Sequence, residues 1–273
     1  MGESIQRIQR RIESSTRSSW FLLLFILIGT LTPPFVERGF DPSKSGGIIL
    51  YILRHALIKN LSPLYPVFKA IPIALLLALA ALGNRVGRLF SAYAGVNYLL
   101  LAVLQGVAVT DEYGLAILTG NLVLMVFVAT LWFWEAVAHR NDFTPRKLPL
   151  SRYWVIPLAF LAFWYPANPR SLQPDFNPAY LLTNAAGLAF CMMTPVYLGV
   201  LILYYPRVNI ATLRVTALLG AIIGFWNMVV NFVMGPLNLQ WWNGVLHIPL
   251  VLTSAYALYL SFGNARGVAG TAW

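Results

Sequence analysis

The sequence predicts an all-α integral membrane protein with about eight transmembrane helices. Hydrophobic residues make up 59% of the 273-residue chain and charged residues only 10%, whereas a soluble domain carries about 25% charged residues. Apolar runs close to the roughly 20 residues that a helix needs to cross a bilayer recur along the chain. Tryptophan and tyrosine gather at the ends of these runs, as they do in the aromatic belts at membrane surfaces.

The candidate spans should form one bundle over residues 20–262, because the remaining stretches are too short for a separate soluble domain. The first run, at 20–37, contains Pro33 and Pro34, which should kink or end a helix. The fifth run, at 150–165, is short for a span. The other runs lie at 66–84, 89–109, 114–137, 178–204, 211–235 and 241–262.

Two further segments are typical of amphipathic helices. Residues 1–19 are polar and basic, with Ile5, Ile8 and Ile12 at helical spacing, which favours a helix on the cytoplasmic leaflet. A frayed tail that only sets the topology is the alternative. Residues 46–60 are apolar, too short to span and basic at their end. We expect an interfacial helix on the extracytoplasmic side there, with a re-entrant segment as the alternative.

The loops between the runs set the expected orientation. If the N-terminus lies in the cytoplasm, most of the 19 lysines and arginines fall on that side, among them Arg207 and Arg214. This pattern predicts a multi-pass protein of the plasma membrane with both termini in the cytoplasm, including a tail at 263–273. It also accounts for the net charge of +10 without a nucleic-acid partner. The first outer loop breaks the pattern, with Arg38, Lys44, Arg54, Lys59 and Lys69.

Polar side chains inside the predicted spans are the best candidates for a ligand site. Amide side chains both donate and accept hydrogen bonds, so they suit a cavity for a small polar solute or for water. The alternative is that they hold neighbouring helices together by hydrogen bonds between them. Six such residues are expected in the outer half of the bundle: Asn121, Asn184, Asn227, Asn231, Asn243 and His247.

Other reactive side chains give weaker signals. Glu135 and His139 are four residues apart on one predicted helix face, a spacing that fits a proton relay or half of a metal site. The other half of such a site is missing, and charges are ordinary at a membrane surface. His55 and His247 are predicted at a similar depth, where two histidines could together bind a metal. Cys191 is predicted mid-membrane, where its soft sulfur could bind copper, although such a side chain usually fills the core. We therefore predict no metal site and no catalytic residue, and the cofactor stays open.

Three classes of function remain. The first is a transporter or channel for a small polar solute, and the second is a non-catalytic subunit of a larger respiratory or other redox complex in the membrane. The third and least favoured is a membrane enzyme that acts on lipid or quinone, because no soluble-type catalytic motif is present. Lipids are the expected partners, together with other membrane subunits or a second copy of the chain. Small residues suited to such an interface are Gly120, Gly187, Gly199, Gly220 and Gly224.

Overall fold

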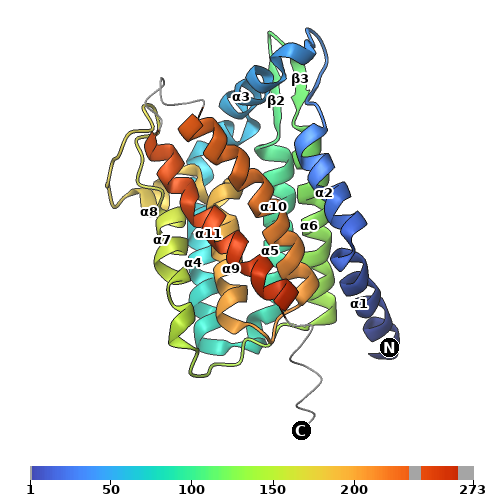
Figure 1. Ribbon diagram of the computed structural model, residues 1–273. Helices are drawn as coiled ribbons and strands as arrows, with labels where there is room; N and C mark the ends of the chain where they lie inside the picture. The colour runs from blue at the N-terminus through green and yellow to red at the C-terminus, as the bar shows by residue number, and fades with distance from the viewer. Residues whose placement is uncertain (1, 234–240, 264–273) are drawn as a thin grey trace.

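A computed structural model describes residues 2–233 and 241–263 of the chain. They form a helical bundle that carries a small sheet at one end (Figure 1). Five helices in this part of the chain are long and apolar enough to cross a membrane, and the number rises to seven if each of two bent helix pairs is one span. The multi-pass helical character agrees with the prediction, but the count of eight is not confirmed.

The long helices form the body of the bundle. At about 1.5 Å per residue, some 20 residues reach across a hydrocarbon layer about 30 Å thick. The helix α10 continues into a short π-helix, η5 (Val229–Val233), and α4 follows the 3-10 segment η2 (Leu57–Leu64). The long helices are α4 (Tyr65–Leu82), α5 (Asn84–Leu104), α6 (Thr119–Ala138), α10 (Ile210–Met228) and α11 (Trp241–Gly263).

The first bent pair joins the N-terminal helix to the first apolar run. The helix α1 (Gly2–Arg17) meets α2 (Ser19–Leu31) at 66°. Between them, Ser18 caps α2 by accepting a hydrogen bond from the backbone N–H of Phe21. With 13 residues, α2 is shorter than the run predicted at 20–37. The chain leaves the helix at Thr32, directly before the two prolines, so the expected break is found there.

The second bent pair breaks the run predicted at 178–204. The helix α8 (Tyr180–Thr183) and the 3-10 turn η4 (Ala185–Leu188) meet α9 (Phe190–Tyr204) at 93°. Ala189 has an extended backbone at the break. The run predicted at 178–204 is therefore not one continuous helix, although the bent pair can still count as one span. The fifth run contains the short helix α7 (Val155–Trp164) after a 3-10 turn, η3 (Leu150–Arg152).

An antiparallel sheet was not predicted. Its strands run in the order β1 (Phe35–Val36), β3 (Gly114–Ile117), β2 (Val107–Thr110). The runs predicted at 89–109 and 114–137 therefore each lose one end to a hairpin, in which Gly114 adopts a left-handed backbone with φ of 64°. The helix α3 (Ser45–His55) follows the 3-10 turn η1 (Pro42–Lys44) and packs on the sheet. It covers much of the interfacial helix expected at 46–60.

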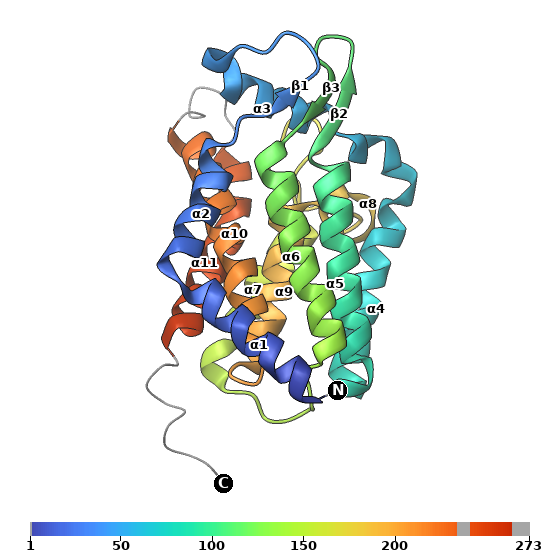
Figure 2. The same ribbon diagram turned by 90° about the vertical axis from the view of Figure 1, so that its right-hand side faces the viewer.

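The two ends of the bundle differ. The sheet and α3 lie at one end, called the sheet end below, and α1 lies towards the other, called the α1 end (Figures 1 and 2). The helix α11 also finishes at the α1 end (Figure 1). The two ends of the described chain thus lie on one side of the bundle, whereas the membrane side that they face stays a prediction. Residues 234–235 of the seventh run and 264–273 of the tail are outside the described residues.

Glycines allow close helix packing inside the bundle. A Cβ atom at Gly220 would clash with the Ser254 hydroxyl on α11, and one at Gly224 would lie 3.0 Å from a methyl group of Val251. The other small residues named above as a possible partner interface, Gly120, Gly187 and Gly199, also face elements of the same chain. These glycines pack the bundle itself, so they do not mark a surface for another subunit.

Candidate functional site

Four of the six predicted ligand residues lie together at the sheet end. Asn227 is on α10, Asn231 is on η5, and Asn243 and His247 are on the first turns of α11. The side-chain N–H of Asn243 donates to the side-chain oxygen of Asn231 at 2.9 Å, and Asn231 donates to the backbone oxygen of Asn227 at 2.8 Å. The Nδ1 atom of His247 lies 2.6 Å from the backbone oxygen of Asn243. We call these residues, with Tyr165, the asparagine cluster.

The other two predicted residues have different surroundings. Asn184 donates to the backbone oxygens of Trp164 and Tyr165 at 2.8 and 3.2 Å and accepts from the backbone N–H of Ala186 at 3.0 Å. It therefore caps η4 and ties it to the end of α7. Asn121 lies in the first turn of α6, and in the described part of the chain no hydrogen bond joins it to the asparagine cluster.

The hydrogen bonds of the asparagine cluster connect helices. The Tyr165 hydroxyl donates to the side-chain oxygen of Asn243 at 2.7 Å, which links the end of α7 to α11. Asn227 donates to the backbone oxygen of Ile223 at 2.9 Å and lies 3.7 Å from the sulfur of Cys191 on α9. Such bonds between helices are those expected of the packing alternative. A solute cavity lined by these amides stays a prediction.

A buried lysine lies close to the broken helix. Lys69 was assigned from the sequence to the basic first loop, but it lies in α4 with none of its surface exposed. Its ammonium donates to the backbone oxygen of Phe163 and lies 4.1 Å from the centre of that ring. No carboxylate of the described chain lies within 4.0 Å of it. A charge inside the apolar run at 66–84 is the sequence signal that identifies this residue.

The helix α5 supplies side chains that satisfy the broken backbone. The side-chain N–H of Asn97 donates to the backbone oxygen of Gly187 at 3.1 Å, and Gln105 accepts from the backbone N–H of Phe190 at 2.9 Å. The Tyr197 hydroxyl donates to the other end of the Asn97 amide at 3.0 Å. A Cβ atom at Gly187 would lie 3.3 Å from the backbone nitrogen of Lys69, so the backbone of η4 adjoins that of α4 at Lys69.

A second polar network lies at the α1 end and was not predicted. Glu135 is 1% exposed, and its two carboxylate oxygens accept from the backbone N–H of Asn141 at 2.7 Å and from the side chain of Asn209 at 2.8 Å. Gln9 of α1 donates to the side-chain oxygen of Asn209 at 2.9 Å. Asn209 also caps α10 by accepting from the N–H of Ala211 at 3.1 Å. We call Gln9, Glu135, Asn141 and Asn209 the carboxylate network.

Glu135 and His139, whose spacing could fit a proton relay, form no hydrogen bond or ion pair between their side chains. His139 ends α6 in a left-handed conformation with φ of 49°, and its backbone N–H donates to the backbone oxygen of Glu135 at 2.8 Å. Its Nε2 atom is buried and has no hydrogen-bond partner among the described residues. Within residues 2–233 and 241–263, no three or more histidine, cysteine, aspartate or glutamate side chains gather where they could hold a metal ion.

Arg214 ties α1 to two helices of the bundle. The sequence placed it in a loop, but it lies in α10 and is 3% exposed. Its guanidinium donates to the Thr16 hydroxyl at 3.0 Å and to the backbone oxygens of Glu13 and Ser261 at 3.2 and 2.9 Å. It also lies over the ring of Phe262, 5.0 Å from the ring centre. The positive-inside pattern therefore includes a buried structural arginine.

Asp142 joins the loops at the α1 end. Its carboxylate accepts from the Thr144 hydroxyl at 2.6 Å and from Asn84 at 2.8 Å, and it forms an ion pair with Arg207 at 3.1 Å. These contacts, with the hydrogen bonds of Thr144 contributing most, lower the pKa of Asp142 far below its usual range. The carboxylate is therefore charged at neutral pH and holds three connecting segments together.

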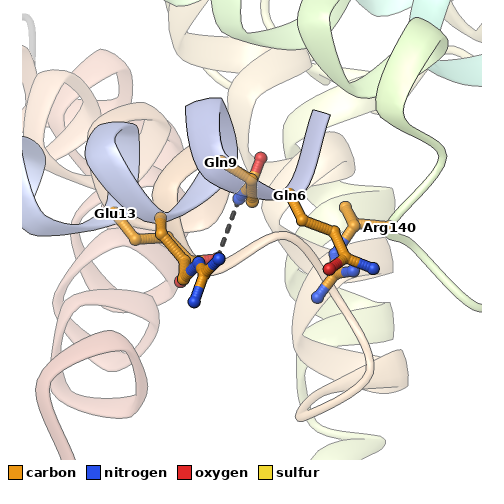
Figure 3. A pocket seen from close by; sticks show the side chains of 5 residues that line it. Gln6, Gln9, Glu13 and Arg140 are labelled. Carbon is orange, nitrogen blue, oxygen red and sulfur yellow. Dashed lines mark hydrogen bonds between the residues drawn. The ribbon is translucent and has the colours of Figure 1, made fainter. Parts of the chain in front are cut away.

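Two surface hollows lie at opposite ends of the molecule. The hollow at the α1 end has a volume of about 300 Å³ (Figure 3). The hollow at the sheet end has a volume of about 620 Å³ and includes His55, whose ring stacks on Tyr51 with 4.1 Å between the centres. The first is lined by Gln6, Gln9, Arg10, Glu13 and Arg140. The second is lined by Glu37, Arg38, Tyr51, His55, Val109, Thr110, Asp111 and Gly114.

Comparison with known proteins gives no functional assignment. No family model matches the chain, and no curated protein or solved structure shows significant similarity to it. The function is therefore inferred from the residues themselves.

Proposed function

We propose that the protein is a membrane transporter or channel for a small polar solute, which contacts the chain at the break between η4 and α9. The observation that carries this proposal is the fully buried Lys69 beside that break. In transporters, interrupted helices bring backbone groups and helix ends to solute sites within the membrane. Ionisable side chains that are buried within transmembrane segments commonly belong to solute or ion pathways.

Lys69 has donor capacity to spare. An ammonium carries three N–H donors, and in the described part of the chain one of them is used, by the backbone oxygen of Phe163. The helix α9 begins at Phe190, so the positive end of its dipole lies at the break. Both features favour a solute with an acceptor oxygen, such as a hydroxyl, an amide or a carboxylate. Phe163 and Asn97 hold the lysine and the break in place.

In this proposal the asparagine cluster supports the site. Asn231, Asn243 and Tyr165 bond to one another across η5, α11 and the end of α7. They therefore hold the helices around the break rather than meeting the solute. The two other classes, a complex subunit and an enzyme of lipid or quinone, have no specific observation in their favour, since the small residues suited to an interface pack within the chain.

Solute flux into liposomes tests the proposal. Stopped-flow light scattering would follow the volume of liposomes that contain the purified protein, with glycerol, urea and sodium formate as probes. We expect at least one probe to enter faster than into protein-free liposomes. Replacing the buried ammonium in Lys69→Met should slow that entry by about tenfold, the scale of one hydrogen bond to a charged group.

The matched control is Lys59→Met, which removes an exposed lysine of η2. It should leave the flux unchanged. Both variants are compared per correctly folded protein, judged by elution as a single species in the same detergent. A folded Lys69→Met protein with full flux would refute the site, and the absence of flux for all three probes would refute the transport function.

A further inference from the structure

We propose that the hollow at the α1 end binds the phosphate of an anionic phospholipid headgroup. Its lining comes from two distant parts of the chain. Gln6, Gln9, Arg10 and Glu13 recur every three or four residues and so share one face of α1, and Arg140 follows the end of α6. Figure 3 shows Gln6 beside Arg140 under the α1 ribbon.

The two arginines of the hollow can bind an anion, although Arg140 also interacts over a longer distance with the carboxylate of Glu135. No carboxylate of the described chain lies within 4.0 Å of Arg10 or Arg140, whose side chains are exposed. The one carboxylate of the lining, Glu13, accepts from Gln9 at 2.8 Å. A guanidinium presents five N–H donors in a plane that matches a phosphate with two parallel hydrogen bonds. The exposed amide of Gln6 adds a further donor.

The position of α1 favours a lipid over a soluble anion. Trp20, at the start of α2, is 81% exposed, and Ile8 of α1 is 44% exposed. Large apolar side chains next to arginines are typical of a helix that lies at headgroup level. The 66° bend sends α2, with its exposed apolar surface, away from α1. A lipid whose headgroup is bound in the hollow would therefore place its acyl chains beside α2, in the hydrocarbon layer of the membrane.

The rest of α1 strengthens the electrostatic match. Arg7 and Arg11 are exposed on the same helix, outside the hollow. Their attraction of about 1 kcal/mol each acts on the charged surface of an anionic bilayer, so it is not expected for a single lipid bound in detergent. The internal face of α1 is fixed to the bundle through Gln9 and Thr16, so the hollow keeps its shape without a ligand.

Native mass spectrometry of the whole protein in mild detergent tests this site. The protein is titrated with phosphatidylglycerol and, separately, with phosphatidylcholine. We expect one tightly bound phosphatidylglycerol, and about tenfold weaker binding in the double variant Arg10→Gln/Arg140→Gln, the scale of a lost charge-assisted hydrogen bond. The matched control Arg7→Gln/Arg11→Gln removes the same total charge but keeps both arginines of the hollow, and it should bind within about twofold of the unchanged protein.

Three outcomes would overturn the proposal. Equal weakening in both double variants would show a diffuse attraction to α1 instead of a site. Equal binding of the two lipids would show that the anionic headgroup is not recognised. Displacement of phosphatidylglycerol by equimolar inorganic phosphate would assign the hollow to a soluble anion. The single variant Arg140→Gln, outside α1, gives the same comparison if the double variant fails to fold.

Discussion

The asparagine cluster and the carboxylate network are both polar groups buried among apolar helices, but they differ in charge and in sequence range. The asparagine cluster contains no carboxylate, and its bonds from Asn243 to Asn231 and from Tyr165 to Asn243 span 12 and 78 residues. The carboxylate network contains Glu135, and its bond from Gln9 to Asn209 spans 200 residues. The first network closes neighbouring helices, whereas the second attaches the N-terminal helix to the far part of the chain.

This difference should appear in stability. Removing one partner of a buried hydrogen bond destabilises the fold more when the group left behind is charged than when it is neutral. Loss of a member of the carboxylate network should therefore destabilise the protein more than loss of a member of the asparagine cluster. The following variants test that order.

The largest effect is expected from Asn209→Ala. This change leaves one oxygen of the Glu135 carboxylate without its partner, removes one of the hydrogen bonds of the Gln9 amide, and removes the cap of α10. The lost bond to a charged group and the lost cap together should cost about 3 kcal/mol. We expect the apparent melting temperature in detergent, followed by tryptophan fluorescence, to fall by about 6 °C or more. The exposed Asn60→Ala is the control, and an equal shift in both variants would contradict the network.

A smaller effect is expected from Asn231→Ala at the sheet end. It removes hydrogen bonds to Asn243 and to the backbone of Asn227, both between neutral groups, so about 1–2 kcal/mol should be lost. The control is Asn121→Ala, which lies apart from the cluster and should change stability by less than about 0.5 kcal/mol. A greater loss than in Asn209→Ala would reverse the comparison. Loss of solute flux at an unchanged melting temperature would support the asparagine-lined cavity instead.

The two networks also show what the sequence can reveal. Helical spacing and depth were enough to bring Asn227, Asn231, Asn243 and His247 to one end, because they lie on two helices joined by a short connection. Their roles were not visible, since an amide that faces a solute and one that faces a neighbour have the same spacing. The bond between Gln9 and Asn209 had no local signal, because only the folded chain brings α1 to the start of α10.

The apolar runs predicted the long helices well and the irregular parts poorly. Hydropathy responds to composition, so the apolar strands β2 and β3 were joined to the predicted runs at 89–109 and 114–137, although they form a hairpin. The break at Ala189 was hidden too, because hydropathy does not report which backbone groups are paired within a helix. Asn97 and Gln105 of another helix satisfy the backbone groups next to the break. Lys69 and Arg214 were assigned to loops because basic residues near span ends usually lie there.

The smallest effect is expected from Asp142→Asn, and it should appear in how the melting temperature depends on pH. The hydrogen bonds from Thr144, Asn84 and Arg207 lower the pKa of Asp142 in the folded state. A carboxylate with a lowered pKa stabilises the fold above its unfolded value of about 3.9, and that contribution is lost as the pH falls towards the folded value. The melting temperature of the unchanged protein should therefore exceed that of Asp142→Asn by a constant amount between about pH 8 and pH 5, and the difference should shrink below about pH 4. The control Asn231→Ala should keep the pH dependence of the unchanged protein, because it removes no titrating group. If the difference in melting temperature for Asp142→Asn stayed constant down to pH 3, the assigned role of the carboxylate would be contradicted.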